Sequence, residues 1–253
     1  MDRESIAFFE QISAVQDETG LFEAFADYCR RHGFESVCYL QLVKSGFRVP
    51  RHRVAAYHNF PEDWSNHYVA QGYYDDDPVM AAALKYAEPF DWFKVPETFD
   101  LTPKQQRFFA DVADAGFKSG YAVPVFGPAG SVAYFGLATM VAEVVMTPEA
   151  KRGLLSVCHQ THLGYLKLQD ADTDTRDLSP REAEVMHWVA LGKSNTAIAE
   201  ILGIASATVD TLMRRIFDKL GVSNRTTAAL KAHGSGMILL EDSGDAAPRH
   251  AGA

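Results

Sequence analysis

Four side chains between residues 64 and 92 combine the donors and acceptors that a small neutral ligand needs. Trp64 and Tyr68 lie four residues apart, so they share one face of a predicted helix, and Asp77 follows Tyr68 by nine residues. Together with Trp92 they supply an indole N–H donor, a phenol, a carboxylate acceptor and an aromatic wall. This set suits a ligand with an amide and a ring carbonyl, although an aromatic pair at this spacing is also common in a plain hydrophobic core.

The same region has no recognisable catalytic or metal-binding pattern. The three consecutive acids that end at Asp77 lack the carboxylate spacing of a calcium loop, so we interpret Asp75 and Asp76 as solvated helix-capping residues. The nearby histidines are not accompanied by a GxSxG elbow or by a Cys-His or Ser-His signature, which argues against an enzyme. The three cysteines have no metal-ligand spacing and are predicted to be buried thiols. We therefore expect neither a metal nor a cofactor.

Residues 178–232 are predicted to form four short helices. The run from Ser179 to Glu182 is a capping box with Pro at the first helical position, so a helix begins there. A second helix follows a cap at Ser194 or Asn195, and a third runs from Ser206 to Leu220 with a continuous apolar stripe. The inward face of the second helix is predicted to carry Ile198, Ile201 and Leu202. Two helices joined by a short turn containing Gly form a helix-turn-helix.

This arrangement predicts a DNA-binding surface. The candidate residues lie around the start of the second helix and on the outer face of the third: Lys193, Ser194, Asn195, Ser206, Thr208, Asp210, Thr211, Arg214 and Arg215. A carboxylate at Asp210 would repel phosphate or accept from a cytosine amino group, and the alternative is a simple i, i+4 pair with Arg214. For the whole block, the alternative is a helical interaction module that binds protein instead of DNA.

The composition is that of a globular protein with two domains. The chain has 253 residues, 47% apolar and 23% charged, which is enough for two hydrophobic cores. No apolar run reaches the roughly 18 residues of a membrane span, and the first residues lack a signal-peptide pattern, so we expect a cytoplasmic protein without membrane contact. Residues 1–176 hold 16 Lys and Arg against 24 Asp and Glu, whereas residues 177–232 hold 7 against 6. A phosphate contact is therefore expected only in the smaller block.

The pattern of elements predicts an α+β protein. A sensing domain over residues 1–170 is expected to be an α/β/α sandwich with a mostly antiparallel central sheet. It is followed by a linker at 171–177, a small all-α helix-turn-helix domain at 178–232 and a tail at 233–253. Most of the tail is expected to be disordered, and the alternative for its apolar cluster, Met237 to Leu240, is docking on a domain. The predicted strands are 35–43, 53–59, 119–126 and 131–140, the last two joined by a hairpin at Gly127 to Gly130. The predicted helices are 4–15, 21–32, 61–71, 102–115 and 147–168.

Two resemblances to a known family cover the chain from about residue 5 to 232. The stretch from Leu178 to Ala228 closely resembles the LuxR-type DNA-binding domain, with Glu182, Gly192 and the KLGV-x-NRT run from Lys219 at hallmark positions. The W-x3-Y-x8-D-P pattern that begins at Trp64, followed by another Trp and by Ser-Gly before a strand, is similar to the autoinducer-binding domain of LuxR-type quorum-sensing regulators. The resemblance implies a ligand-responsive transcriptional regulator.

The second resemblance also implies a ligand and a role for each pocket residue. The ligand is expected to be an N-acyl-homoserine lactone, with Trp64 donating to the lactone carbonyl and Asp77 accepting from the amide N–H. Trp92 is expected to form an apolar wall near the lactone, Tyr68 to line the pocket, and Gly120 to allow close backbone packing.

Phe60 and Gly136 depart from the family pattern at the acyl end of the ligand. Phe60 stands where many members carry a Tyr that bonds the acyl carbonyl, and Gly136 stands where a Ser or Thr adds a second polar contact. Either Tyr68 or a water replaces these groups, or the acyl group differs from the common fatty chains. Tyr134, two residues before Gly136, points to the same face of its strand and is expected to refill the lost volume.

We therefore predict a regulator that binds an inverted-repeat operator as a homodimer, with the helix from Ser206 to Leu220 in the major groove. Helix 147–168 has more apolar positions than one contact stripe needs, which makes it the candidate dimer interface. These positions are Leu154, Leu155, Val157, Leu163, Leu166 and Leu168. The alternative is an orphan receptor of the same family that responds to a different small molecule or folds without one.

Overall fold

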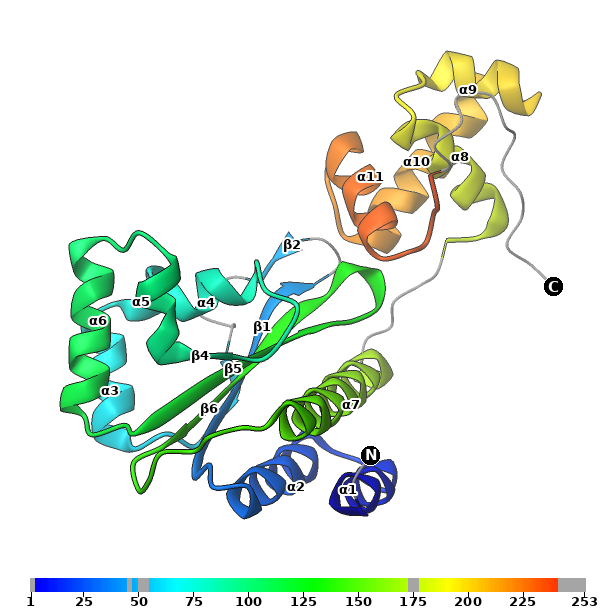
Figure 1. Cartoon of the computed structure of the whole chain (residues 1–253). Helices are drawn as coiled ribbons and strands as arrows, with labels where there is room; N and C mark the ends of the chain where they lie inside the picture. Colours follow the sequence, from blue (N-terminus) through cyan, green and yellow to red (C-terminus); the bar gives the residue numbers. More distant parts are fainter. Residues whose placement is uncertain (1–2, 45–46, 50–54, 173–177, 241–253) are drawn as a thin grey trace. The chain divides into compact units, whose positions relative to one another are not determined.

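The structure is a computed structural model that describes residues 3–44, 47–49, 55–172 and 178–240. Most of the chain up to Ala171 belongs to one compact unit, and the chain from Asp172 onward makes up most of a second unit (Figure 1). Three predicted segments extend beyond the described residues: the start of the strand 53–59, most of the linker 171–177 and the tail from residue 241 onward.

A six-stranded sheet forms the centre of the first unit. Its strand order is β2-β1-β6-β5-β4, with β3 also paired to β1, and the pairs β1–β3, β1–β6, β5–β6 and β4–β5 are antiparallel. The strands are β1 (Ser36–Lys44), β2 (Phe47–Arg48), β3 (Ala55–His58), β4 (Phe90–Asp91), β5 (Ser119–Phe126) and β6 (Val132–Thr139). The four predicted strands correspond to β1, β3, β5 and β6. Strands β2 and β4 have two residues each, which is too short for a periodic signal.

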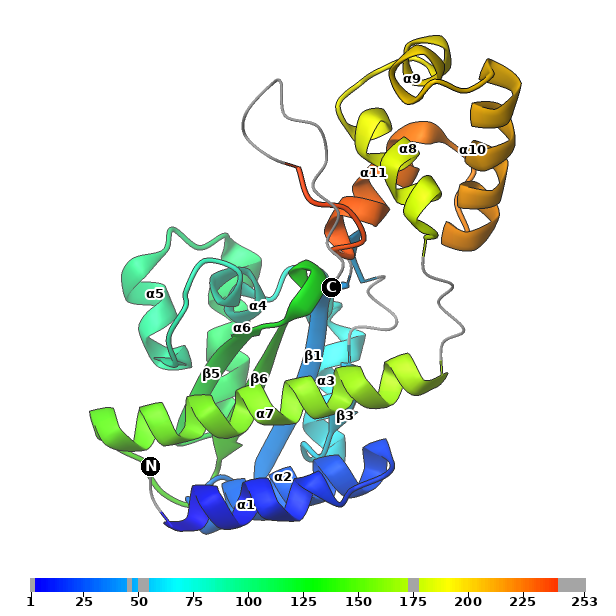
Figure 2. The same cartoon turned by 90° about the vertical axis from the view of Figure 1, so that its right-hand side faces the viewer.

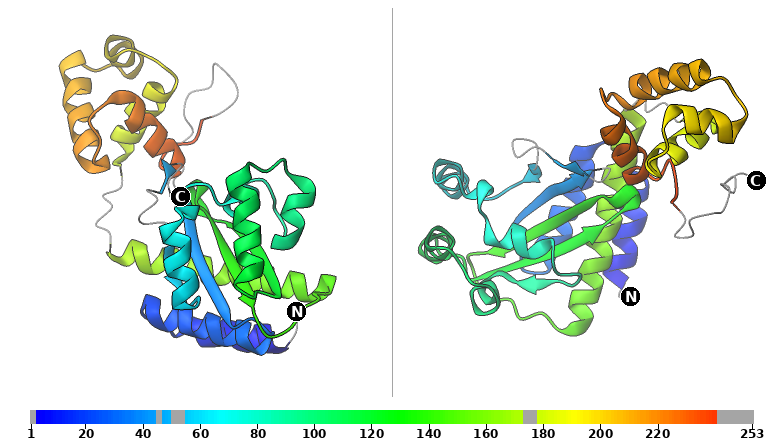
Figure 3. Two further views of the ribbon diagram at one scale, coloured as in Figure 1. Left: turned by 90° about the vertical axis from the view of Figure 1, so that its left-hand side faces the viewer. Right: turned by 90° about the horizontal axis from the view of Figure 1, so that it is seen from above.

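Helices cover both faces of this sheet, which confirms the predicted α/β/α class. Helices α1 (Arg3–Ser13), α2 (Glu18–Arg31) and α7 (Pro148–Asp172) pack on one face, as Figures 1 and 2 show. Helices α3 (Glu62–Ala70), α4 (Pro78–Ala83) and α6 (Pro103–Asp114) lie on the other face (Figure 3). The short elements η2 (Tyr73–Asp75), η3 (Trp92–Lys94) and α5 (Val95–Thr98) complete the unit, and η4 (Pro128–Gly130) lies in the turn between β5 and β6. Sequence periodicity did not predict α4 or α5, because one turn of helix presents no repeat.

Alternation along the strands divides the interior of this unit into two cores. Tyr39 and Phe135 belong to the core beneath α1, α2 and α7, where Phe25 lies 4.6 Å from Phe135 between ring centroids. Leu40 follows Tyr39 in β1, and Tyr134 precedes Phe135 in β6. Both belong to the second core, beneath α3, α4 and α6. Because successive side chains of a strand point to opposite faces, one sheet supports a solid core on one side and a separate aromatic cluster on the other.

Helix α7, the candidate dimer interface, contributes part of its apolar surface to the first core. Leu154 and Val157 are 3% and 0% exposed and pack inside the unit, so neither is available to a second chain. Leu155, Leu166 and Leu168 are half-buried against the same core. Fewer of the six apolar positions of α7 are therefore available for a contact with a second chain.

A buried polar network joins α7 to the sheet. Nδ1 of His162 hydrogen-bonds the hydroxyl of Tyr39 at 2.8 Å, and its Nε2 hydrogen-bonds the hydroxyl of Ser131 at 3.2 Å. His162 is fully buried, and burial lowers its pKa to about 4, with the charge of His159 acting in the same direction. The imidazole is therefore neutral at physiological pH, when its two nitrogens serve as one donor and one acceptor.

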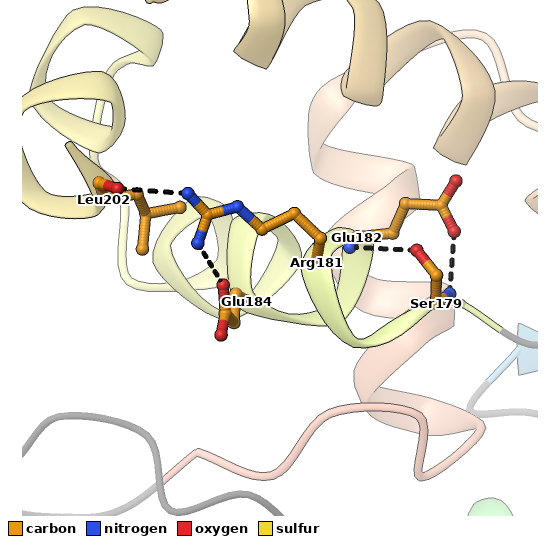
Figure 4. A network of polar contacts seen from close by, with 5 residues as sticks. All are labelled: Ser179, Arg181, Glu182, Glu184 and Leu202. Atoms are coloured by element: carbon orange, nitrogen blue, oxygen red, sulfur yellow. Dashed lines mark hydrogen bonds and ion pairs between the residues drawn. The ribbon is translucent and has the colours of Figure 1, made fainter. Parts of the chain in front are cut away.

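The second unit is a bundle of four helices: α8 (Pro180–Ala190), α9 (Asn195–Leu202), α10 (Ser206–Leu220) and α11 (Arg225–Gly234). Figure 4 shows the capping box that starts α8, in which the Ser179 N–H donates to Glu182 at 2.7 Å and the Glu182 N–H donates to the Ser179 hydroxyl at 3.4 Å. Lys219 of α10 donates to the same Glu182 carboxylate at 2.6 Å, and Arg181 reaches the carbonyl of Leu202 at the end of α9. The start of α8 is thus tied to both helices of the helix-turn-helix.

Two details of this bundle differ from the sequence prediction. Ile201 was expected on the inward face of α9, but it is 46% exposed, and Ala199 is buried in its place beside Ile198. The chain also remains ordered past residue 232, because Ile238 is 5% exposed in the core of the bundle and His187 hydrogen-bonds the carbonyl of Leu239. The apolar residues after α11, Met237 and Ile238, therefore pack into the core of the bundle.

Among the described residues, no single helix is long and apolar enough to cross a membrane, and only the pair α9 and α10, bent by 111°, meets the length and composition criteria when taken together. Within the same part of the chain, no group of three or more His, Cys, Asp or Glu side chains is placed to hold a metal ion.

Candidate ligand cavity and nucleic-acid interface

A cavity of about 390 Å³ lies in the second core, between the sheet and the helices α3 and α4. This volume is in the range of sites that hold drug-sized molecules. Its lining is mostly apolar, with seven aromatic side chains: Cys38, Leu40, His58, Phe60, Trp64, Ser65, Tyr68, Val69, Tyr74, Asp77, Val79, Met80, Trp92, Phe108 and Tyr134. Six of the seven predicted pocket residues are in this set, and the seventh, Gly136, lies behind the wall.

Asp77 is the only carboxylate among the lining residues, and its two oxygens have different partners. Oδ1 accepts the backbone N–H groups of Val79 and Met80, at 2.7 and 3.3 Å, and thereby caps α4. Oδ2 accepts a hydrogen bond of 2.8 Å from the hydroxyl of Tyr68. The helix-capping role that the sequence analysis gave to Asp75 and Asp76 thus belongs to Asp77.

The surroundings of Asp77 favour its neutral form. The side chain is 6% exposed, and burial raises its pKa to about 6, although the hydrogen bonds from Tyr68 and from the two backbone amides partly oppose this rise. Oδ2 accepts from one donor among the described residues, Tyr68, so this oxygen gains from a further N–H that enters the cavity. The site is therefore suited to an occupant with an amide or another N–H group.

Two aromatic side chains on α3 form one wall of the cavity. Trp64 and Tyr68, which the sequence analysis placed on one helix face, are half-buried with ring centroids 6.2 Å apart. Trp64 also packs edge-on against Phe117 at 5.4 Å. Both residues therefore combine a packing role with a place in the lining.

Trp92 forms the opposite wall and lies flat on the sheet, where two glycines make room for it. A Cβ added to Gly120 would lie 2.2 Å from Cε3 of the indole, so a side chain there would collide with the ring. A Cβ added to Gly136 would lie 2.7 Å from Sγ of Cys38 and 3.1 Å from Cζ2 of the indole, so the thiol would have to move. Gly136 also faces the thiol of Cys38 and the ring of Tyr134, and Phe60 stacks on Trp92 with an interplanar angle of 18°. These rings occupy the volume that the missing side chain would fill.

Side chains of α6 hold the elements that surround the cavity. Asp111 accepts hydrogen bonds from Tyr73 at 2.5 Å and from His67 at 2.6 Å, so it joins η2 and α3. Gln105 donates to the carbonyl of Asp76 at 3.2 Å. These contacts hold the segment that leads from α3 to Asp77. Sequence reasoning missed them because their partners lie 29 to 44 residues apart.

Sequence reasoning also missed several lining residues, including Cys38, Leu40 and His58. They come from β1 and β3 and reach the cavity only because strand pairing places Cys38 opposite His58. Their signal was the alternation of the strands, which gives a face but not the element that covers it.

The exposed side of the helix-turn-helix carries most of the predicted DNA-contacting residues. Exposed side chains are Lys193, Ser194, Ser206, Thr208, Asp210, Arg214 and Arg215, while Asn195 and Thr211 are half-buried. Ser194 caps α9 by accepting from the N–H of Ala197, and Thr211 donates to the carbonyl of Ala207 within α10. The two arginines project from α10, the helix predicted to enter the major groove.

Asp210 has a partner that neither alternative of the sequence analysis included. Its Oδ1 accepts from the side-chain amide of Asn195 at 2.7 Å, so the expected pair with Arg214 is not the bond that forms. The carbonyl oxygen of Asn195 in turn accepts from Arg225 at 2.7 Å, and Arg225 also donates to the backbone carbonyl of Lys193. This relay ties α9, α10 and the start of α11 together across the turn.

Comparison with known families matches two stretches of the chain. Residues 17–163 match the family described as "Autoinducer binding domain", and residues 176–232 match the family described as "Bacterial regulatory proteins, luxR family". The first match contains the cavity, and the second contains the four-helix bundle up to α11.

Individual proteins match the chain across both parts. The chain is 28% identical over 242 residues to the transcriptional activator protein SolR of Ralstonia solanacearum, a match that covers 91% of this chain and 97% of SolR. It is 27% identical to the HTH-type quorum sensing-dependent transcriptional regulator RpaR of Rhodopseudomonas palustris, covering 94% of this chain and 96% of RpaR. The crystal structure of SdiA from Escherichia coli has the same fold, with a TM-score of 0.75 at 20% identity over 93% of this chain and 98% of SdiA.

Proposed function

Because the chain belongs to the luxR family of bacterial transcriptional regulators with an autoinducer-binding domain, we propose that an N-acyl-homoserine lactone occupies its cavity and controls its binding to DNA. The family consists of DNA-binding regulators and not of enzymes. In this proposal, residues 1–170 sense the ligand, 171–177 link the two parts, and 178–232 bind the operator.

The observation that carries the proposal is a buried carboxylate in the wall of an otherwise apolar cavity. Asp77 is 6% exposed, and Oδ2 accepts one hydrogen bond from a protein donor, Tyr68. A carboxylate oxygen has room for two, so an amide N–H of the ligand binds beside the tyrosine. Trp64 donates to the lactone carbonyl, and the acyl chain packs among the aromatic side chains.

The second half of the proposal concerns DNA. The family supports DNA binding, and the exposed Arg214 and Arg215 on α10 supply the positive charge that phosphate or guanine requires. We propose that two chains bind an inverted repeat with α10 of each chain in the major groove. The half-buried leucines of α7, Leu155, Leu163, Leu166 and Leu168, contribute to the contact between the two chains.

Ligand burial provides the coupling between the two activities. An occupant that binds only the folded sensor stabilises it by about 2.7 kcal/mol when its concentration is a hundred times its dissociation constant. The folded sensor then supports the dimer that binds both half-sites.

The direct test is mass spectrometry of small molecules that co-purify with the full chain. The protein is expressed in a strain that makes acyl-homoserine lactones and in a matched strain that makes none. A lactone retained only from the first strain, and lost from the Asp77→Asn variant, supports the proposal. Protein that folds and binds DNA equally well from both strains, with no retained lactone, contradicts it.

A second candidate is an orphan receptor with a different small-molecule ligand. It is favoured by Phe60 and Gly136, which provide no side-chain donor at the acyl end of the cavity. The same mass-spectrometric experiment would then identify a retained molecule that is not a lactone.

A further inference from the structure

The cavity reaches the surface of the sensor beside the segment that leads from α3 to Asp77. Of the described lining residues, three are exposed: His58 on β3, Val69 near the end of α3 and Tyr74 in η2. The exposed fractions of Val69 and Tyr74 are 64% and 39%, whereas Tyr134, on the sheet side of the same cavity, is 3% exposed. The path from the cavity to solvent therefore runs beside α3 and η2.

Helix α3 contributes no fully buried side chain to the core. None of its nine residues is buried, and in the turn and η2 that follow it only Tyr73 is, at 2% exposed. Segments with few buried apolar contacts open locally at a much lower free energy than the whole domain unfolds. The polar contacts of α3 and η2 then set how often this segment opens.

Side chains of α6 provide these polar contacts. Oδ2 of Asp111 accepts from the hydroxyl of Tyr73 at 2.5 Å and from Nε2 of His67 at 2.6 Å, so one carboxylate holds both η2 and α3. Lys104 donates to the carbonyl of Gly72, between the two elements, at 3.2 Å. Burial would raise the pKa of Asp111, but the hydrogen bonds from Tyr73 and His67 outweigh it and lower this pKa. The carboxylate is therefore ionised at neutral pH, and its bonds are charge-assisted.

We propose that α3 and η2 form a gate through which the ligand enters and leaves the cavity, and that Asp111 is the positioning residue that holds this gate closed. The inference rests on the proposed function, because it needs a small molecule that exchanges with the cavity. Asp111 is not among the lining residues, so it acts through Tyr73 and His67. When the gate opens, the bond from Tyr68 to Asp77 breaks as well, whereas Asp77 stays in place because its other oxygen caps α4.

A gate of this kind changes the rates of ligand exchange and not the affinity. In this proposal the bonds to Asp111 form whether the cavity is empty or filled, so they stabilise the closed form of both states equally. Their loss makes opening more frequent in both states. The association and dissociation rate constants should then rise by the same factor, and the dissociation constant, which is their ratio, should stay the same. A residue that only shapes the bound complex would instead raise the dissociation rate constant alone.

The test measures both rate constants on the full chain. The probe is the acyl-homoserine lactone, with a chain of four to twelve carbons, that the parent chain binds most tightly. Association is followed by the fluorescence of the cavity tryptophans, and dissociation by a chase of radiolabelled probe with excess unlabelled probe. Asp111→Ala removes both bonds, and Tyr73→Phe removes only the hydroxyl. Asp114→Ala is the matched control, because Asp114 lies one turn further along α6, is exposed, and has no hydrogen bond to its carboxylate within the described part of the chain.

Both rate constants are expected to rise about tenfold or more in Asp111→Ala, since one hydrogen bond to a charged group is worth about that factor in an equilibrium constant. The dissociation constant should remain unchanged. Tyr73→Phe should raise both rate constants by a smaller factor, and Asp114→Ala should leave both as in the parent. In the parent chain, hydrogen exchange should be faster for the amides of α3 than for those of α6, and it should slow in α3 when the probe binds. This measurement needs no variant, so it tests the gate even if Asp111→Ala does not fold.

Several results would overturn the inference while the proposed function stands, because the probe still binds. A rise in the dissociation rate constant alone would show that Asp111 only stabilises the bound complex. Unchanged rate constants in both variants, or α3 amides that exchange no faster than those of α6, would show that the ligand enters by another route. If the acyl-homoserine lactones of every tested length fail to bind the parent chain, the proposed function itself is wrong, and the gate is lost with it.

Discussion

The hydroxyl of Tyr68 donates a hydrogen bond of 2.8 Å to Oδ2 of Asp77, while the other oxygen of the same carboxylate caps α4. One side chain therefore holds a helix in place and faces the cavity. If the whole carboxylate is removed, a loss of ligand binding has two explanations, because loss of the cap alone would distort the cavity wall. A matched pair of substitutions separates them.

Asp77→Asn is expected to abolish the response to ligand while the chain still folds. Asn is as good a helix cap as Asp, so its carbonyl oxygen keeps the bonds to Val79 and Met80. Its NH₂ group replaces Oδ2 and cannot accept from a ligand N–H. We expect affinity for N-octanoyl-homoserine lactone to fall about tenfold to a hundredfold, measured by calorimetry, since a hydrogen bond to a charged group contributes about 1.5 to 3 kcal/mol.

Asp77→Ala serves as the comparison. It loses the cap as well, so thermal unfolding without ligand should show a further loss of about 1 kcal/mol that Asp77→Asn does not. Unchanged ligand affinity in Asp77→Asn would remove Asp77 from the binding site, whatever its effect on stability.

Ligand affinity should increase with pH through the titration of Asp77. Burial raises the pKa of this carboxyl to about 6, so in the folded chain without ligand it is mostly protonated at pH 5 and ionised at pH 7.5. A ligand N–H binds the ionised form better, so the dissociation constant should be about tenfold higher at pH 5 than at pH 7.5. The Asp77→Asn chain, which has no group titrating there, should show a flat profile. If ligand affinity changed with pH by the same amount in both chains, the pH dependence would belong to another group.

His162 should make the sensor less stable in acid. Burial lowers its folded-state pKa to about 4, whereas an unfolded histidine titrates near 6.5. The unfolded chain therefore takes up a proton first, and stability that is present above pH 6.5 is lost as the pH falls towards 4, by about 3 kcal/mol. Asp77 acts in the opposite direction over the same range, because its folded-state pKa is raised. Urea unfolding between pH 4.5 and 7 measures this effect. The free energy of unfolding should fall more steeply with decreasing pH in the parent than in His162→Gln.

The sequence predicted the elements whose signals are local. The capping box at Ser179 and Glu182 and the apolar stripe of α10 depend on neighbours within a few turns, and the structure has both. The pattern of strands and helices likewise predicted a sheet covered on both faces, and Tyr39 and Leu40 belong to the cores on its two faces. For these elements, residue type and spacing were sufficient.

The parts that were missed depend on partners that are distant in sequence. The bond from Asn195 to Asp210 crosses a turn, and the pairing of Cys38 with His58 needs the strand register. Asp77 was found as a candidate acceptor, but its capping role was assigned to its neighbours, although Pro78 at the first helical position was a local signal for a cap at Asp77. Ile201 was placed inward because the periodicity of an eight-residue helix leaves its orientation loosely defined.

Arg215→Ala is expected to weaken operator binding by about 1 to 3 kcal/mol if the residue binds a base edge. Its side chain is exposed on α10 and has no described role in the core of the bundle. A base contact weakens binding mainly to the operator, whereas a phosphate contact weakens binding to all sequences and reduces the salt slope by about one unit. Titrations on operator and random DNA at several salt concentrations separate the two, and equal affinity of mutant and parent on both would exclude any contact.

Asp210 should influence which base pair is preferred, and its bond to Asn195 makes this testable. The amide of Asn195 holds Oδ1 in place, and Arg225 in turn holds Asn195. A carboxylate fixed in this way on the exposed side of α10 can accept from the amino group of cytosine through Oδ2. Because the side chain is already ordered before DNA binds, binding loses little of its conformational entropy.

Selection from a random DNA library is therefore expected to show one operator position at which Asp210→Ala loses its preference for cytosine. Asn195→Ala should lose the same preference only in part, because the carboxylate remains but is no longer oriented. If Asp210 instead serves only to join α9 to α10, both variants would bind every sequence more weakly and select the same operator as the parent. The distinction lies in the selected sequence and not in the affinity, so a modest loss of stability in either variant does not obscure it.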